Sequence, residues 1–216
     1  VDANVMGTKE DKACHYNTDR KVNKDSEFIV ISKKDLRLYV YGTIKGDTAL
    51  LAKYPACLSK VKGQKQKVGD MKTPSSPAGK PFSITQIQDA STWKHDFKDG
   101  RGSIKAYGNW FMRLKTGFSG IGIHGTHAPE SIGTRATEGC IRVENSNLDN
   151  LRSYVTVGMA VIIGPENGRI YAGLGQELAG KQEARKARER EERKAREQKS
   201  KSSTSLQVSR SQEQGT

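Results

Sequence analysis

Short apolar runs separated by glycine and proline fill residues 27–170, and they constrain the fold more than any other feature of this sequence. Residues 35–41 alternate, so Leu36, Leu38 and Val40 share one face of an expected strand. Further strands are expected over residues 28–31, 50–58, 82–87, 109–114, 120–124 and 159–163. Pro55 indicates that the strand over residues 50–58 is an edge or bulged strand. Many short strands with glycine- and proline-containing turns are typical of a mainly β sandwich or barrel.

One or two short helices and a charged tail complete the expected architecture. Residues 146–155 predict a helix, with Ser146 or Asn147 as its N-cap. Residues 176–201 are rich in good helix formers but lack an apolar stripe, which predicts a solvated, charged helix. After Ser200 we expect disorder. The chain therefore divides into a polar N-terminal arm (1–26), a central β domain (27–170) and a charged helical, then disordered, tail (171–216).

The net charge of +13 on 216 residues narrows the class of partner. Residues 27–175 carry +9 and the tail carries +4, and five lysines crowd the segment 60–72. This basic loop is either simply solvated or binds an anionic polymer. Aromatic residues are not interleaved with the lysines and no nucleic-acid motif is present, so we expect no nucleic acid. No run approaches ~18 apolar residues, which excludes a transmembrane helix.

A histidine and a cysteine that border expected strands are the strongest candidates for chemistry. His124 ends a strand, Gly125 opens a loop, and Gly139-Cys140 begins another element about fifteen residues later. A thiol becomes a nucleophile when an imidazole takes its proton and backbone N–H groups face the developing oxyanion. Glycine at position 139 lets the chain approach closely enough for such donors. From spacing alone, Cys140 is either a nucleophile or a small buried hydrophobic residue.

A metal site is a competing interpretation of the same residues. His124, His127 and Cys140, together with His95, are chemically suitable ligands, but their spacing fits no standard zinc pattern. We therefore expect no metal and no cofactor. His127 is expected at the edge of a cleft, and His15 and His95 at the surface.

The order of several motifs resembles the L,D-transpeptidase (YkuD-like) catalytic domain. His124-Gly-Thr, Ser131-Ile-Gly133, Thr137-Glu-Gly-Cys-Ile-Arg142 and Asn147-Leu-Asp149 resemble the signature of this family. Upstream, residues 28–41 resemble its opening hairpin, and residues 69–82 resemble its Gly-x-x-x-Thr-Pro-x-Gly-x-Phe segment with an insert at 75–78. Glu138 departs from the pattern, because many members have histidine there. The resemblance covers roughly residues 27–165 and implies the family's β-sandwich or barrel.

The resemblance implies a peptidoglycan L,D-transpeptidase. Cys140 would attack the carbonyl of the third residue of a stem tetrapeptide, D-alanine would leave, and an amine of another stem would resolve the acyl-enzyme as a 3→3 cross-link. His124 would move the proton, oriented by the carbonyl of Gly125, and Gly139 would belong to the catalytic turn. Water as acceptor would give a carboxypeptidase, and a free D-amino acid would give exchange. The sequence leaves these acceptors open.

Four further side chains are expected around the substrate. Arg142 either binds a substrate carboxylate or holds the loop by pairing with a backbone or acidic group. Thr137, His127 and Tyr107 are assigned to the cleft, whereas Trp110 is expected in the core.

The implied substrate also indicates the compartment. We expect the periplasm or cell envelope, reached by export with a leader that is absent from this chain. Cys14 and Cys57 either pair in that oxidising space or remain free thiols. The tail is either solvated or contacts an anionic partner in the envelope. Two other classes remain as alternatives: a non-catalytic wall-binding module, and a polyanion-binding protein that uses the lysine loop and tail.

Overall fold

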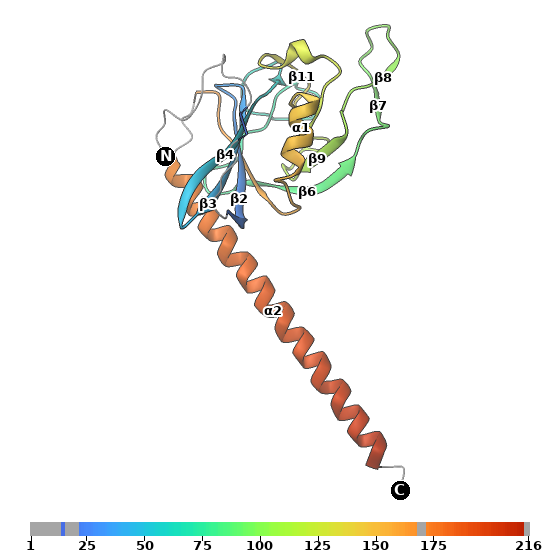
Figure 1. Ribbon diagram of the computed structural model, residues 1–216. Coiled ribbons are helices and arrows are strands. Elements are labelled where there is room, and N and C mark those ends of the chain that lie inside the picture. Colours follow the sequence, from blue (N-terminus) through green and yellow to red (C-terminus); the bar gives the residue numbers. More distant parts are fainter. Residues whose placement is uncertain (1–13, 16–21, 168–171, 214–216) are drawn as a thin grey trace.

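The computed structural model describes residues 14–15, 22–167 and 172–213, and a nine-stranded sheet forms its centre (Figure 1). The strand order is β1-β4-β3-β2-β13-β6-β9-β10-β12. These strands are β1 (Cys14–His15), β2 (Asn23–Ser32), β3 (Arg37–Ile44), β4 (Asp47–Pro55), β6 (Phe82–Asp89), β9 (Trp110–Leu114), β10 (Gly122–His124), β12 (Ile141–Arg142) and β13 (Ala160–Ile163). Two small sheets pair β5 (Leu58–Ser59) with β11 (Arg135–Thr137), and β7 (Lys94–Asp96) with β8 (Ser103–Lys105). The prediction of a mainly β fold is confirmed.

The strand β2 lies inside the sheet because both of its faces are apolar. It pairs antiparallel with β3 and parallel with β13, where Ile29 lies beside Val161. Ile29 and Ile31 enter the main core, together with Leu36, Leu38 and Val40 as the alternation predicted. The opposite face carries a second buried cluster of Phe28, Val30, Tyr39, Tyr41 and Ile162. Burial of both faces explains why β2 reads as a continuous apolar run.

The segment predicted as one strand over residues 50–58 is interrupted. β4 ends at Pro55, and Cys57 forms an isolated bridge with Arg142 before β5 begins. Among the described residues, β4 pairs on its outer side only with β1. Its pairing with β3 on the other side contains a register shift at Val40/Tyr41. The edge-like position inferred from Pro55 matches this arrangement.

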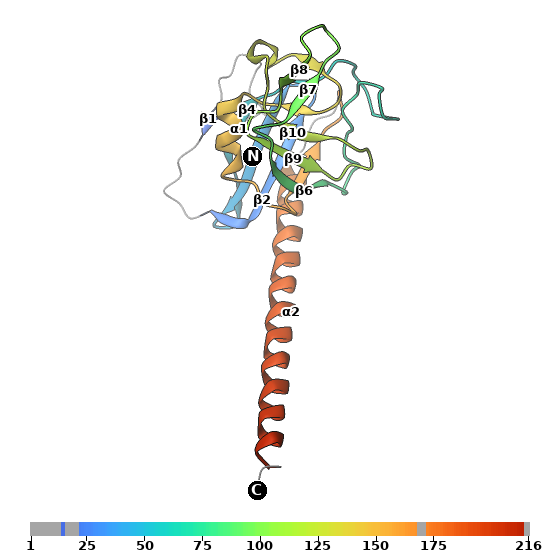
Figure 2. The same cartoon turned by 90° about the vertical axis from the view of Figure 1, so that its right-hand side faces the viewer.

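The helices are α1 (Asn145–Arg152), α2 (Ala172–Glu213) and the 3-10 turn η2 (Pro129–Ser131). α1 buries Leu148 and Leu151. Its N-cap is Glu144, so the prediction of Ser146 or Asn147 as N-cap is wrong: both residues lie inside the first turn. α2 contacts β2, β3 and β4 and then projects away from the sheet (Figures 1 and 2). Ion pairs from Lys186 and Arg190 to Asp25 join it to the start of β2.

The expected disorder after Ser200 is wrong, because α2 continues to Glu213. Once a helix is nucleated, each added residue gains one backbone hydrogen bond, so extension costs little. Hydroxyl groups in this part donate back to helix carbonyls, Ser203 to Lys199 and Thr204 to Ser200.

Most of the expected N-terminal arm lies outside the described residues, and β2 begins within it, at Asn23. Cys57 is a free, buried thiol, so the alternative in which it pairs with Cys14 is not the one found. The side chains of Cys14 and His15 lie outside the described residues, and so does the predicted surface position of His15.

Candidate active site

Four adjacent strands place the candidate side chains in two rows across one face of the sheet. The first row runs over β6, β9 and β10 through Gln86, Arg113 and Gly122. Cys140, the residue directly before β12, continues this row, because its thiol contacts the N–H of Gly122. The second row runs parallel to it through Gln88, Phe111, His124 and Arg142. The residues between the rows point to the opposite face, where they meet the main core: Ile87, Met112, Ile123 and Ile141. The period of two along each strand therefore separates the site from the core.

This register brings Cys140, the residue directly before β12, close to His124, the last residue of the neighbouring parallel strand β10. Ile123 pairs with Ile141, so Cys140 lies beside Gly122 and diagonally from His124. Diagonal neighbours lie about 7 Å apart, within reach of an imidazole and a thiol. Both side chains line one cleft of about 420 Å³. Position 122 requires glycine, because a Cβ atom there would lie 2.5 Å from the Phe111 ring.

His124 is held with one nitrogen free to accept a proton. Its ring is 5% exposed, stacks on Phe111 with centroids 5.6 Å apart, and meets the edge of Tyr107 at 4.9 Å. Nδ1 donates to the carbonyl of Gly125 at 2.7 Å, which leaves Nε2 as an acceptor. Burial lowers the pKa of His124 to about 3; the contact with Gly125 opposes this shift and the charge of Arg142 adds to it. The imidazole is therefore neutral at physiological pH.

The loop that follows His124 is fixed by close backbone packing. Gly125 donates its N–H to the carbonyl of Tyr107 at 2.7 Å. A Cβ atom at Gly125 would lie 2.2 Å from Asn145 Oδ1 and 2.9 Å from the Cα atom of Gly108. Asn145 also bonds both backbone groups of Thr126, at 2.8 and 3.1 Å. The sequence analysis missed Asn145, because its position beside the predicted N-caps gave no sign of this long-range contact.

Cys140 is half-buried and its thiol donates to the carbonyl of Gly120 at 3.1 Å. Burial raises the pKa of the thiol, and it outweighs the Gly122 N–H and the guanidinium groups of Arg142 and Arg113, which lower that pKa. Glu138, exposed at the cleft, adds a small upward contribution to the same pKa. The resting pair is therefore a neutral thiol and a neutral imidazole.

Threonine hydroxyls hold the turn that presents Cys140. Thr137 Oγ1 donates to the carbonyl of Cys140 at 2.7 Å and accepts the N–H of Gly139 at 3.2 Å. Thr73 donates to the carbonyl of Gly139 at 3.0 Å. Gly139 has φ +136°, and a Cβ atom there would lie 2.9 Å from the carbonyl oxygen of Lys72. Because Thr137 takes the Gly139 N–H, the N–H of Cys140 is the remaining candidate of the two expected oxyanion donors.

The other predicted residues divide between the cleft and its surroundings. Tyr107 and Arg142 line the cleft, and Arg142 is 6% exposed with a buried Nε that has no partner among the described residues. His127 is not in the cleft wall; its ring packs on Phe97 with centroids 4.5 Å apart. Trp110 is half-buried against the main core, as predicted.

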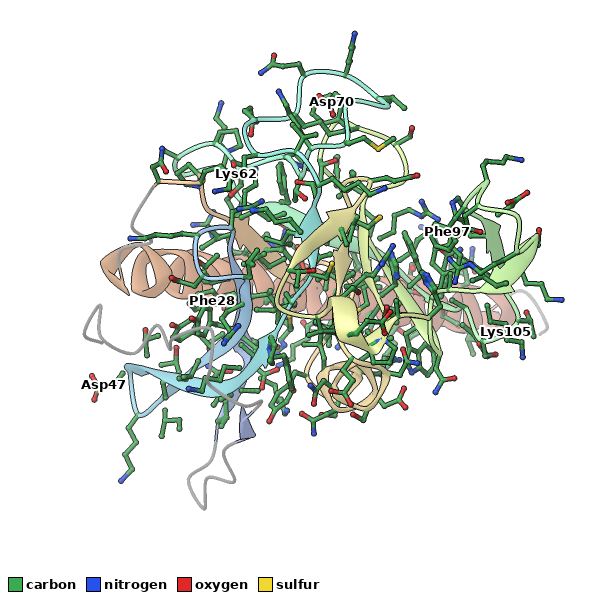
Figure 3. The ribbon with its side chains drawn as sticks, turned by 90° about the horizontal axis from the view of Figure 1, so that it is seen from above. Phe28, Asp47, Lys62, Asp70, Phe97 and Lys105 are labelled. Carbon is green, nitrogen blue, oxygen red and sulfur yellow. The ribbon has the colours of Figure 1, made fainter. Side chains whose placement is uncertain are left out.

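An aromatic hairpin forms one cleft wall that the sequence analysis did not anticipate. Trp93, His95 and Phe97 line the cleft from β7 and its flanks, which overturns the predicted surface position of His95. These residues alternate with Lys94 and Asp96, so a two-residue period was present as a signal. The alternating segment is too short to predict a strand with certainty from the sequence. In the structure, the β7–β8 hairpin projects from the domain (Figures 1 and 3).

The lysine loop forms another wall. Lys65, Val68, Gly69 and Met71 line the cleft. Asp70 organises this loop: its carboxylate accepts three backbone N–H groups and the ammonium group of Lys65, at 2.8 Å. Burial acts to raise the pKa of Asp70, but these hydrogen bonds hold it below its ordinary range. Figure 3 shows Asp70 and Lys62 on this loop, away from the hairpin that carries Phe97.

The described residues offer neither a cluster of metal ligands nor a membrane-spanning helix. Among them, no three side chains of histidine, cysteine, aspartate and glutamate gather as metal ligands would. In the same part of the chain, no helix combines the length and apolar character needed to cross a membrane.

Comparison with known proteins identifies the domain. Residues 26–163 match the family model of the L,D-transpeptidase catalytic domain, YkuD. The chain belongs to this family. The matched L,D-transpeptidase domain runs from β2 to β13 and contains His124 and Cys140, whereas α2 lies outside it. A search of curated proteins finds no match.

Solved structures similar to the chain include further L,D-transpeptidases. Bd1075 of Bdellovibrio bacteriovorus is 20% identical with a TM-score of 0.47, over 72% of this chain and 54% of that one. An L,D-transpeptidase of Mycobacterium smegmatis is 22% identical with a TM-score of 0.42, over 64% and 58%. Pgp2, the helical cell shape determining protein of Campylobacter jejuni, is 18% identical with a TM-score of 0.47, over 82% and 58%. The chain spans 54% to 65% of the length of Bd1075, the M. smegmatis enzyme and a Xylanimonas cellulosilytica L,D-transpeptidase.

Proposed function

We propose that this protein is a peptidoglycan L,D-transpeptidase with Cys140 as nucleophile and His124 as general base. The observation that carries the proposal is that both side chains line one cleft, with His124 at the end of β10 and Cys140 directly before β12, the strand that pairs with β10. The free Nε2 of a neutral imidazole supports it, because a base must be unprotonated to accept the thiol proton.

In the acylation step, Cys140 Sγ bonds to the carbonyl carbon of the third residue of a stem tetrapeptide. His124 Nε2 takes the thiol proton as the sulfur attacks. The N–H of Cys140 donates to the oxyanion. When the intermediate collapses, the amide C–N bond breaks, the proton passes from His124 to the amine, and D-alanine leaves.

In the second step, a side-chain amine of another stem attacks the thioester. The new C–N bond forms, the C–S bond breaks, and His124 carries the amine proton to the departing sulfur. The product is a 3→3 cross-link and the thiol is regenerated. Hydrolysis or D-amino-acid exchange differs only in the acceptor, and these are the second candidate activities of the same site.

Purified muropeptides with tetrapeptide stems test the proposal by mass spectrometry of the products. Dimers joined between third residues indicate transpeptidation, tripeptide monomers indicate hydrolysis, and altered terminal residues indicate exchange. Cys140→Ala is expected to abolish all three, whereas Cys57→Ala, the same change at the buried thiol, retains turnover. Wild-type protein that is folded and leaves every muropeptide unchanged contradicts the proposal.

The other functional classes give different results in the same preparation. A non-catalytic wall-binding module predicts that Cys140→Ala leaves any turnover unchanged. A polyanion-binding protein predicts DNA binding that weakens steeply with salt and does not depend on Cys140. A location in the periplasm or cell envelope, and an anionic contact through the exposed charges of α2, remain predictions.

A further inference from the structure

A guanidinium group that the sequence analysis did not single out lies in the same row as the nucleophile. We propose that Arg113 binds a carboxylate of the donor peptide and so aligns the scissile carbonyl over Cys140; this inference rests on the proposed function. Arg113 pairs with Gly122, which lies beside Cys140. Its side chain lines the same cleft as Cys140 and His124.

Glycine at position 122 leaves room for the Phe111 ring, and this ring determines where the Arg113 side chain lies. The Phe111 ring occupies the space over Gly122, where a Cβ atom would meet two of its carbons at 2.5 and 2.6 Å. The guanidinium of Arg113 lies on this ring, 4.8 Å from its centroid. The ring therefore holds the positive charge of Arg113 in the cleft lining. This charge acts to lower the pKa of the Cys140 thiol.

Neutral partners fix Arg113 without cancelling its charge. Its Nε donates to the side-chain oxygens of Gln86 at 3.2 Å and Gln88 at 3.3 Å, and Nη2 donates to Gln88 at 3.1 Å. Two other arginines of the domain are neutralised by a carboxylate: Arg135 pairs with Glu166, and Arg101 pairs with Asp99. Within the described part of the chain, no carboxylate forms an ion pair with Arg113. A positioned but uncompensated guanidinium is suited to a carboxylate ligand.

The charges around Arg113 agree with such a ligand. The described lining of the cleft contains Lys65, Arg113 and Arg142 but only one carboxylate, Glu138. Arg113 lies on β9 in the first row and Arg142 on β12 in the second row, and β10 with His124 lies between these two strands. Two carboxylates of a stem peptide flank the scissile bond: that of its terminal D-alanine, and that of the third residue's side chain when this residue is a diamino diacid.

The test compares kcat/KM of wild type and Arg113→Gln on three tetrapeptides. One carries both carboxylates, one has an amidated C-terminus, and one has lysine as its third residue. Arg113→Gln is expected to lower kcat/KM about 10- to 100-fold on the first peptide, the effect of losing a charge-assisted contact. On the peptide that lacks the bound carboxylate, wild type should show a kcat/KM that is lower by a similar factor, and Arg113→Gln should lower it no further. The peptide that behaves in this way identifies which carboxylate Arg113 binds. Equal losses on all three peptides overturn the inference.

Gln88→Glu provides an independent variant that keeps Arg113 in place. The new carboxylate would neutralise the guanidinium, so the same peptide-selective loss is expected. Arg113→Lys should restore part of the activity, because it keeps the charge but loses the fork geometry. Arg152→Gln is the matched control, since Arg152 lies 4.9 Å from the Trp110 ring, outside the cleft lining. A Gln88→Glu variant with wild-type kinetics contradicts the inference.

Two readouts separate failure of the inference from failure of the proposed function. Alkylation of Cys140 by iodoacetamide, at a pH high enough to ionise the thiol, should be equally fast in wild type and Arg113→Gln. Equal alkylation with selective loss of turnover supports a carboxylate contact. Turnover of none of the peptides by wild-type protein refutes the proposed function itself, and the inference falls with it.

Discussion

The neutral resting state of Cys140 and His124 predicts an unusual pH dependence for a cysteine nucleophile. A fall in the pKa of His124 from 6.5 to about 3 through burial makes charging the ring about 5 kcal/mol harder in the fold. At pH 5 only about one ring in a hundred is protonated, so no imidazolium is present to stabilise a thiolate. The thiol pKa is itself raised by burial. Below that pKa, the thiolate fraction therefore grows about tenfold with each pH unit.

The assay is the rate of iodoacetamide alkylation of Cys140 from about pH 5 to 10, followed by mass analysis of the peptide that contains it. We expect a continuous rise with no plateau below about pH 9. His124→Gln should leave this profile nearly unchanged, because it removes a neutral group. The same variant should lower turnover about 10²- to 10⁴-fold, because it removes the base.

A plateau with a midpoint below about pH 7 would refute this reasoning, since it requires a thiolate–imidazolium pair. A rise in the alkylation midpoint of more than about one unit in His124→Gln would refute it independently. The Cys57→Ala variant is the control that separates alkylation of Cys140 from exposure of the buried thiol by unfolding.

Three further predictions concern the scaffold of the site. Gly125→Ala places a Cβ atom 2.2 Å from Asn145 Oδ1, so it should lower the free energy of unfolding by about 1–3 kcal/mol in urea denaturation and abolish turnover. Asn145→Ala leaves the backbone groups of Thr126 unpaired and should cost about 1–3 kcal/mol in the same measurement; an unchanged midpoint would contradict the bracing role. Burial lowers the pKa of Lys33 from 10.5 to about 8, although Glu166 opposes the shift. Between these pH values the unfolded chain binds the extra proton, so stability should rise with pH in that window, and Lys33→Met should remove the rise.

The sequence supported inferences wherever the signal was local or carried by motif order. Alternation over residues 35–41 predicted which side chains enter the core, since one face of a strand collects every second residue. The order of His124-Gly-Thr and Gly139-Cys140 with the upstream segments indicated the family that the match over residues 26–163 shows. The short helix near residue 146 followed from the spacing of its apolar residues, whereas its N-cap was not predicted correctly.

What depended on pairing between distant segments was decided only by the tertiary structure. Arg113 and Cys140 share a row because β9, β10 and β12 pair in one particular register, and a shift of one residue would turn Arg113 toward the core. His95 lies in the cleft because β7 and β8 fold as a hairpin. The alternating segment around His95 is too short to predict a strand from the sequence. Register and hairpin docking are set by the summed packing of many residues far apart in the chain. The motifs therefore indicated the candidate reacting groups, and the sheet determined which charges surround them.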